Sequence, residues 1–190
     1  VDGLIRAFEN HGSGKISLKE ILNPAIRLAE RGFELSHFEA NRLNAYKSFF
    51  EKNEAASKIF IRNNGKPWEK GHILIQKDLA KTLKRIARYG RDGFYSGTVA
   101  QLIIEEMKRG NGLITKEDLL RYESKYRAPV LGTYKGHDII SMGPPSSGGA
   151  LLVNMLNMLE NYPMDTLGWN SSEYIHLLTE VERRAYADRA

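Results

Sequence analysis

The sequence predicts an α+β fold that is mostly helical, with only a few short strands. Apolar residues recur at helical spacing over most of the chain, and capping boxes and glycines bound several of these stretches. Two short segments of strand character flank Lys135-Gly136. The 190 residues are 42% hydrophobic and 27% charged, which is the composition of a folded chain with a core of its own.

The first predicted helix begins at the capping box Ser17-Leu-Lys-Glu20, after which apolar residues follow at helical spacing. Pro24 lies inside this stretch, so we expect a kink there or a restart with Asn23 as the cap. Gly32 is placed to end the helix.

A second capping box, Ser36-His-Phe-Glu39, predicts a helix that carries an aromatic-rich set of residues: Phe38, Leu43, Tyr46, Phe49 and Phe50. Beyond it, Ile59 and Ile61 alternate with polar residues, which predicts extended chain, and Asn64-Gly65 predicts a turn.

Further helices are predicted over residues 77–89, 97–109, 115–122, 149–161 and 171–189. Gly90 and Gly110 end the first two, while Thr115 caps the third and Pro129 breaks it. Asn170 is the expected cap of the last helix. We expect residues 1–128 to form a mainly helical region, and residues 129–190 to form a strand pair with two helices.

Composition excludes several kinds of site. With no cysteine there is no disulfide framework, Cys metal site or thiol nucleophile. No apolar run reaches the roughly 18 residues that span a membrane, and the sequence has no signal-peptide pattern. The net charge of +5 argues only weakly for an anionic partner.

Residues 9–20, "ENHGSGKISLKE", resemble a calcium-binding EF-hand loop in the placing of Gly14 and Glu20. Glu9 and His11, however, stand where the first and third oxygen ligands belong. Residues 109–119 match less well, because Met107 and Arg109 fall in ligand positions. We therefore expect glycine-rich turns followed by capped helices.

Five cations fall on one face of the predicted helix 77–89: Lys77, Lys81, Lys84, Arg85 and Arg88. Such a face can meet phosphates, but no aromatic residues alternate with the cations, and Leu79, Leu83 and Ile86 occupy the opposite face. We expect a solvated helix surface and no nucleic-acid binding.

A Ser-His-Asp set occurs in the order Ser146 or Ser147, His176 and Asp188. The nucleophile-elbow spacing G-x-S-x-G is missing, because a proline stands at its first glycine. We expect no triad. The other histidines are scattered without metal-ligand spacing: His11, His37, His72 and His137.

The segment "MGPPSSGGALLVNMLNMLENYP", residues 142–163, places a proline-serine-glycine loop before an apolar helix. A helix N-terminus with glycines can cradle an anion. The structural alternative, which we favour, has Ser146 or Ser147 as the cap and Gly148 and Gly149 allowing close packing. The buried face of the helix would consist of Leu152, Met155, Leu156 and Leu159.

Several segments together resemble the large subunit of the gamma-glutamyltranspeptidase family, in the expected order and nearly from end to end. They are "NPAIRLAERGFELS", "IQKDLAKTLKRIARYGRDGFYSGTVAQLIIEEM", "GLITKEDLLRYESKYRAPV", "LGTYKGHDIISMGPPSSGGALLVNMLNMLENY" and "TEVERRAYADRA". Gly143 stands where a third proline is common in the family. The resemblance places the chain in the central part of the large subunit.

The resemblance implies an N-terminal-nucleophile hydrolase with a four-layer αββα core, made as a precursor that cuts itself into two subunits. Its nucleophile is a threonine at the start of the small subunit, and no Thr-Thr-His-like segment occurs in these 190 residues. The implied partners are that small subunit and a γ-glutamyl donor such as glutathione. Export to the periplasm, medium or cell surface is implied as well. We expect no cofactor and no metal.

No catalytic or substrate-binding residue is therefore assigned to this chain. The signature loop, which consists of Pro144, Pro145, Ser146, Ser147, Gly148 and Gly149, is expected to be structural. Two alternatives remain open: a related acylase acting on poly-γ-glutamate or cephalosporin-type substrates, and a non-catalytic helical module that binds calcium or nucleic acid.

Overall fold

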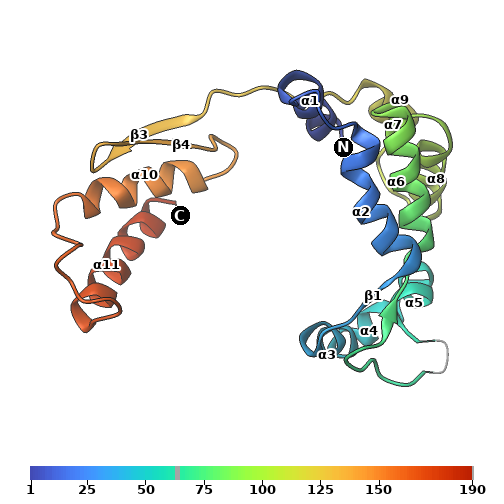
Figure 1. Cartoon of the computed structure of the whole chain (residues 1–190), viewed down its shortest axis with the longest axis horizontal. Coiled ribbons are helices and arrows are strands. Elements are labelled where there is room, and N and C mark those ends of the chain that lie inside the picture. The colour runs from blue at the N-terminus through green and yellow to red at the C-terminus, as the bar shows by residue number, and fades with distance from the viewer. Residues whose placement is uncertain (63–64, 190) are drawn as a thin grey trace. The chain divides into compact units, whose positions relative to one another are not determined.

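The computed structural model describes residues 1–62 and 65–189 and falls into two compact units, Val1–Ser124 and Lys125–Ala190 (Figure 1). Helices make up most of both units and the strands are short, which confirms the mostly helical α+β class. Each unit is described by itself.

The first unit contains nine helices and two short strands among its described residues. Their bounds are α1 Asp2–His11, α2 Leu18–Arg31, β1 Phe33–Glu34, α3 His37–Ala45, α4 Lys47–Phe50, α5 Glu54–Phe60, β2 Ile73–Leu74, α6 Lys77–Tyr89, α7 Asp92–Tyr95, α8 Gly97–Arg109 and α9 Lys116–Arg121.

The long helices α2 and α6 lie side by side and form the middle of this unit (Figure 1). Ile26 and Ala29 of α2 and Ala80 and Ile86 of α6 are buried, while the outward faces carry charged residues. The predicted capping box of α2 is present, since Ser17 and Glu20 exchange backbone and side-chain hydrogen bonds. The bounds of α6 and α8 are those predicted.

The strands β1 and β2 pair antiparallel and join the helical pair to a small apolar cluster. Leu35, Ala40 and Leu74 form its centre, and Trp68 packs against it. Gly32 precedes β1 with φ of 87°, and a Cβ there would lie 2.3 Å from Cγ2 of Ile73. A residue with a side chain would clash with β2 at this position, in addition to the strain of the positive φ.

The second unit has two strands and two helices, β3 Val130–Tyr134, β4 His137–Ser141, α10 Gly148–Leu159 and α11 Ser172–Arg189. The predicted hairpin is confirmed, with Tyr134 paired to His137 across the turn Lys135-Gly136. Both turn residues have positive φ, 47° and 80°, as a two-residue hairpin turn with right-handed strand twist requires. Helix α10 packs on the hairpin and on α11.

One prediction in the first unit is wrong. The segment expected to be extended at Ile59 is the end of helix α5, which Asn53 caps by accepting a hydrogen bond from the backbone of Ala56 at 3.0 Å. Side-chain alternation over so few residues fits a short helix equally well. Asn64 of the expected turn lies outside the described residues.

Other boundaries differ from expectation. Helix α2 runs through Pro24, which excludes the restart at Asn23, while the kink at Pro24 stays a prediction. The helix after Ser36 is interrupted at Tyr46. The short helix predicted over residues 115–122 is confirmed as α9, with Thr115 as its N-cap and Tyr122 as its C-cap.

In the second unit, Asn170 does not cap α11. Its φ is 57°, and the Ser171 hydroxyl accepts the hydrogen bond from the backbone of Tyr174 at 3.2 Å instead. Leu152 of α10 is also wrongly placed in the buried face, because 39% of its surface is exposed while Leu159 is buried.

Candidate functional site

The signature loop connects the end of β4 to the start of α10 in the second unit. Gly149 is buried there, and a Cβ on it would lie 2.1 Å from the backbone oxygen of Met142. Gly148, one residue earlier, is exposed, and its nearest contact would be the Ser146 hydroxyl at 3.3 Å. Close packing of the loop on the strand therefore depends on Gly149 rather than on both glycines.

The two serines of this loop cap the helix only weakly. Ser147 occupies the N-cap position with φ of −76° and ψ of −15°, and its side chain accepts no capping hydrogen bond. The Ser146 hydroxyl accepts one from the backbone of Gly148 at 3.2 Å. Backbone shape, more than side-chain capping, holds the start of α10.

The Ser-His-Asp set is dispersed in the structure. Helices α10 and α11 run antiparallel. Asn154, in the middle of α10, donates to Asp188 near the C-terminal end of α11 at 3.1 Å. His176, near the N-terminal end of α11, shares a recess with Met158 and Tyr162, which come later in the chain than Asn154. The 12 residues of α10 span about 18 Å. His176 therefore lies a helix length from the serines, and no triad can form.

The recess between α10 and α11 has a volume of about 650 Å³ and contains charged groups from α11, namely Glu180 and Arg184. Hydrogen bonds from Arg183 and Arg184 lower the pKa of Glu180 to about 2. Its carboxylate is thus committed to two guanidinium groups and is no general base at neutral pH.

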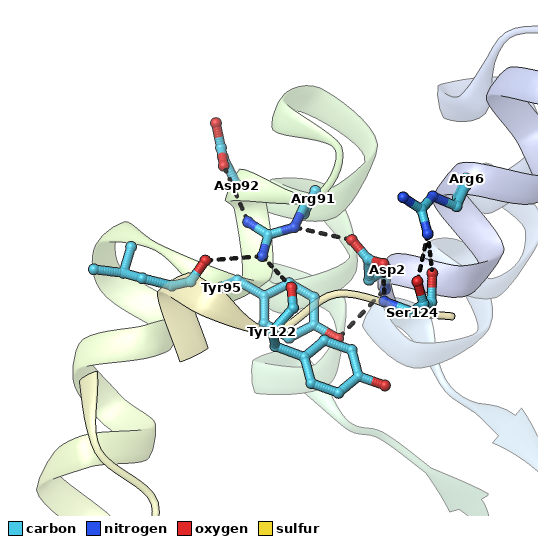
Figure 2. A network of polar contacts seen from close by, with 8 residues as sticks. Asp2, Arg6, Arg91, Asp92, Tyr95, Tyr122 and Ser124 are labelled. Carbon is cyan, nitrogen blue, oxygen red and sulfur yellow. Dashed lines mark hydrogen bonds and ion pairs between the residues drawn. The ribbon is translucent and has the colours of Figure 1, made fainter. Parts of the chain in front are cut away.

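A network of polar contacts joins distant segments of the first unit (Figure 2). Asp2, only 7% exposed, accepts from Nε of Arg91 at 2.9 Å and from the backbone of Ser124 at 2.8 Å. The other end of the Arg91 guanidinium donates to the backbone oxygens of Leu120, at 3.1 Å, and Tyr122. We call this set of residues the Asp2–Arg91 clasp.

Aromatic and cationic contacts complete the clasp. The rings of Tyr95 and Tyr122 stack with centroids 5.3 Å apart, and the Arg91 guanidinium lies 4.9 Å from the Tyr95 ring. Arg6 donates to the backbone oxygen of Ser124 as well (Figure 2). The clasp thus fastens the first helix and the segment after α9 to α7.

Hydrogen bonds from Ser124, assisted by Arg91, lower the pKa of Asp2 to about 2, although burial alone would raise it. The carboxylate is therefore ionised throughout the neutral range. Both of its oxygens are engaged in hydrogen bonds, one with Arg91 and one with Ser124, so we assign the clasp a structural role.

The calcium-like segment cannot form a loop of the required kind. Glu9 and His11 lie in helix α1, and the Glu20 carboxylate accepts from the backbone and hydroxyl of Ser17 at 2.8 and 2.6 Å. These hydrogen bonds also lower the pKa of Glu20. In the described part of the chain, no three His, Cys, Asp or Glu side chains are grouped as metal ligands.

Sequence reasoning missed α1 and with it Asp2. The signal was available, because Leu4, Ile5 and Phe8 follow helical spacing between an acidic first turn at Asp2 and Gly12. The partner Arg91 had no comparable signal, since its contact with Asp2 joins residues 89 positions apart.

Membrane-spanning character is absent from the helices of the described residues, none of which is long and apolar enough to cross a bilayer.

Comparison with known proteins gives one consistent family. The sequence model described as "Gamma-glutamyltranspeptidase" matches residues 1–190. The "Glutathione hydrolase proenzyme" of Escherichia coli (strain K12) is 41% identical over 190 residues, which is 100% of this chain and 32% of that protein. The "Acylase ACY 1 proenzyme" of Pseudomonas sp. (strain SE83) is 38% identical over 93% of this chain and 32% of its own length.

A solved structure agrees with these sequence matches. The gamma-glutamyltranspeptidase of Helicobacter pylori superposes with a TM-score of 0.89 at 43% identity, covering 98% of this chain and 53% of that one. The chain thus spans about a third of the length of the curated relatives it matches.

Proposed function

This chain belongs to the gamma-glutamyltranspeptidase family, and we propose that it forms part of the large subunit of an enzyme that transfers γ-glutamyl groups. The donor would be glutathione or a similar γ-glutamyl compound, and the acceptor water, an amino acid or a peptide. The observation that carries the proposal is the family match over residues 1–190, together with the 41% identity to a glutathione hydrolase proenzyme.

In this proposal the nucleophile is a threonine hydroxyl outside residues 1–190, at the start of a small subunit released from the same precursor. Its free α-amino group takes the hydroxyl proton, and the oxygen attacks the γ-carbonyl of the donor to form an ester. The amine leaves, and water or a second amine then attacks the ester and regenerates the threonine.

The role proposed for this chain is to support the site. Among the described residues, the serines of the signature loop lie far from His176. The carboxylates of Asp2 and Glu180 are already held in hydrogen bonds. Gly149 lets α10 start directly against the end of β4, and the Asp2–Arg91 clasp fixes the segment that leads out of the first unit. The chain by itself is expected to be inactive.

The direct test is hydrolysis of γ-glutamyl-p-nitroanilide by the full-length protein. We expect turnover that is abolished when the proposed threonine is replaced by alanine, while replacement of Ser146 or Ser147 by alanine leaves it within about threefold of the parent. Sustained turnover by residues 1–190 alone would contradict the proposal.

A second candidate is a related acylase with a different donor, favoured by the 38% identity to the Acylase ACY 1 proenzyme. Comparing kcat/KM of the full-length protein for glutathione, poly-γ-glutamate and a cephalosporin-type substrate separates the two. Higher efficiency for either alternative substrate would replace the first candidate while keeping the family and the ester chemistry.

We also propose that the full-length protein is exported, on the strength of the family membership alone. Cell fractionation would find it in the periplasm, the medium or at the cell surface, and recovery with the cytoplasmic fraction would contradict the proposal. The proposed partner of this chain is the small subunit, which should copurify with it after processing.

A further inference from the structure

The outward face of helix α6 carries a straight row of five cations, which we call the α6 stripe: Lys77, Lys81, Lys84, Arg85 and Arg88. At 100° per residue they fall within an arc of about 100°, and from first to last they span about 16 Å along the axis. All five side chains are exposed.

Most of this charge is not neutralised within the first unit. Lys81 bonds Asp78 at 2.8 Å, and Lys84 pairs with Glu30 of α2. Two carboxylates therefore offset five cations, and the other three, Lys77, Arg85 and Arg88, have no acidic partner among the described residues. The pairs that do exist are exposed and weak, so an external anion can compete for them.

The opposite face of α6 is already used. Ala80 and Ile86 are buried in the packing of α6 on α2, so this apolar face is already covered within the first unit. Charge is therefore the main means by which the α6 stripe can bind a partner. The exposed Tyr89 stands at the end of the stripe, and its phenol ring suits the headgroup level of a lipid surface.

We propose that the α6 stripe docks the protein on an anionic lipid surface. A flat surface of phosphates can meet all five cations of a straight stripe at once, and clusters of four to eight cations on an amphipathic helix are typical of such docking. Nucleic acid fits less well, because the stripe has no aromatic side chains between its cations on which bases stack.

A recess of about 380 Å³ adjoins the stripe, with Arg85, Ser96 and Thr98 in its lining. Asp92 lines it too, and its carboxylate disfavours a bound anion there. The proposal therefore rests on the stripe and not on this recess. It is also independent of the proposed transferase activity, so either can fail without the other.

The test is cosedimentation of the full-length protein with vesicles of phosphatidylglycerol and phosphatidylcholine in equal parts. We expect binding at about 50 mM salt that falls at least tenfold at 0.5 M salt, where the Debye length shrinks to a few ångströms. Vesicles of phosphatidylcholine alone should not bind. Absence of binding to the anionic vesicles at low salt would overturn the proposal.

Two matched variants separate the stripe from net charge. Replacing all five stripe cations by glutamine should weaken partitioning at least about 100-fold, since each cation near an anionic surface contributes about fivefold. The control replaces five exposed cations that are scattered over other parts of the first unit, Lys15, Lys19, Lys70, Lys108 and Lys116. It removes the same charge and should stay within about fivefold of the parent.

An equal loss in the control variant would overturn the proposal, because binding would then follow net charge alone. If the variant with all five substitutions fails to fold, as judged by circular dichroism, the double variant Arg85→Gln/Arg88→Gln takes its place. Its partitioning onto the vesicles should weaken about 25-fold. Tighter binding to duplex DNA than to the vesicles at equal salt, lost in the same variants, would assign the stripe to nucleic acid instead.

Discussion

The Asp2–Arg91 clasp and the signature loop hold their surroundings by different means. The clasp uses an ionised, nearly buried carboxylate with directional hydrogen bonds to residues far apart in sequence. The loop uses contact of Gly149 with the Met142 backbone, and neither a charge nor a hydroxyl cap fixes the start of α10. One region should respond to charge and pH, and the other to volume.

The signature loop is easy to notice in the sequence, whereas the Asp2–Arg91 clasp becomes visible only in the structure. Residues 144–149 are rich in proline, serine and glycine, but their role in the structure is close packing of the backbone. Asp2 and Arg91 lie in contact in the structure, although neither of their segments contains a recognisable motif.

The largest effect is expected for Asp2→Ala. Arg91 would keep a partly buried charge without its carboxylate, and the Ser124 backbone N–H would lose its acceptor, at a cost of about 3 kcal/mol. Native-state hydrogen exchange in the full-length protein should show about 100-fold faster exchange of the Ser124 amide.

The matched control for that variant is Asp92→Ala. Asp92 lies 4.0 Å from the same guanidinium, but its side chain is 76% exposed. We expect less than about 0.5 kcal/mol, as for other exposed ion pairs. A comparable loss of stability in both variants would show that the buried ion pair of the clasp contributes no more than an exposed one.

The next largest effect is expected for Gly149→Ala, because the added methyl group would collide with a backbone oxygen that cannot swing aside. The cost should be about 2 kcal/mol, seen as faster exchange in the first turns of α10. Gly148→Ala should be neutral or slightly stabilising, since alanine favours the helix and meets only a side-chain hydroxyl. Equal effects at the two glycines would remove the packing argument.

The pH response should separate the two regions. Because the pKa of Asp2 is about 2 in the folded protein and ordinarily 3.8, its stabilisation is present above pH 4 and is lost as pH falls toward 2. The amount is about 2 kcal/mol. Comparing parent and Asp2→Asn by denaturant titration should give a difference at pH 6 that shrinks by pH 2, and a difference constant with pH would refute the linkage.

The smallest effect concerns the caps. Ser17→Ala removes a complete capping box at the start of α2 and should cost about 1 kcal/mol. Ser147→Ala removes no capping bond and should change stability by less than about 0.5 kcal/mol. Exchange rates in the first turns of α2 and α10 measure both, and a larger loss at Ser147 would show that its hydroxyl does cap the helix.

Local signals predicted much of the fold. The limits of α6 and α8 follow from glycines at Gly90 and Gly110, and the hairpin follows from a turn whose residues both accept positive φ. These features depend on neighbours in sequence, so sequence alone suffices for them.

Some of the misses depend on contacts between residues that are distant in sequence, whereas α1 and the Asn53 cap of α5 have local signals. Helix α5 exists because Asn53 caps it and because Trp68 donates to the Phe60 backbone oxygen at 2.7 Å. The clasp joins Asp2 to residues more than 80 positions away. For the signature loop, the sequence predicted close packing correctly, but only the structure distinguishes Gly149 from Gly148 and finds Ser147 without a capping bond.

We propose that this chain supports a γ-glutamyl transfer site whose nucleophile lies outside residues 1–190. Mass spectrometry after acid quenching of the full-length protein with a γ-glutamyl donor tests this most directly. We expect a γ-glutamyl adduct on a threonine outside residues 1–190 and none on residues 142–149. An adduct on Ser146 or Ser147 would contradict it.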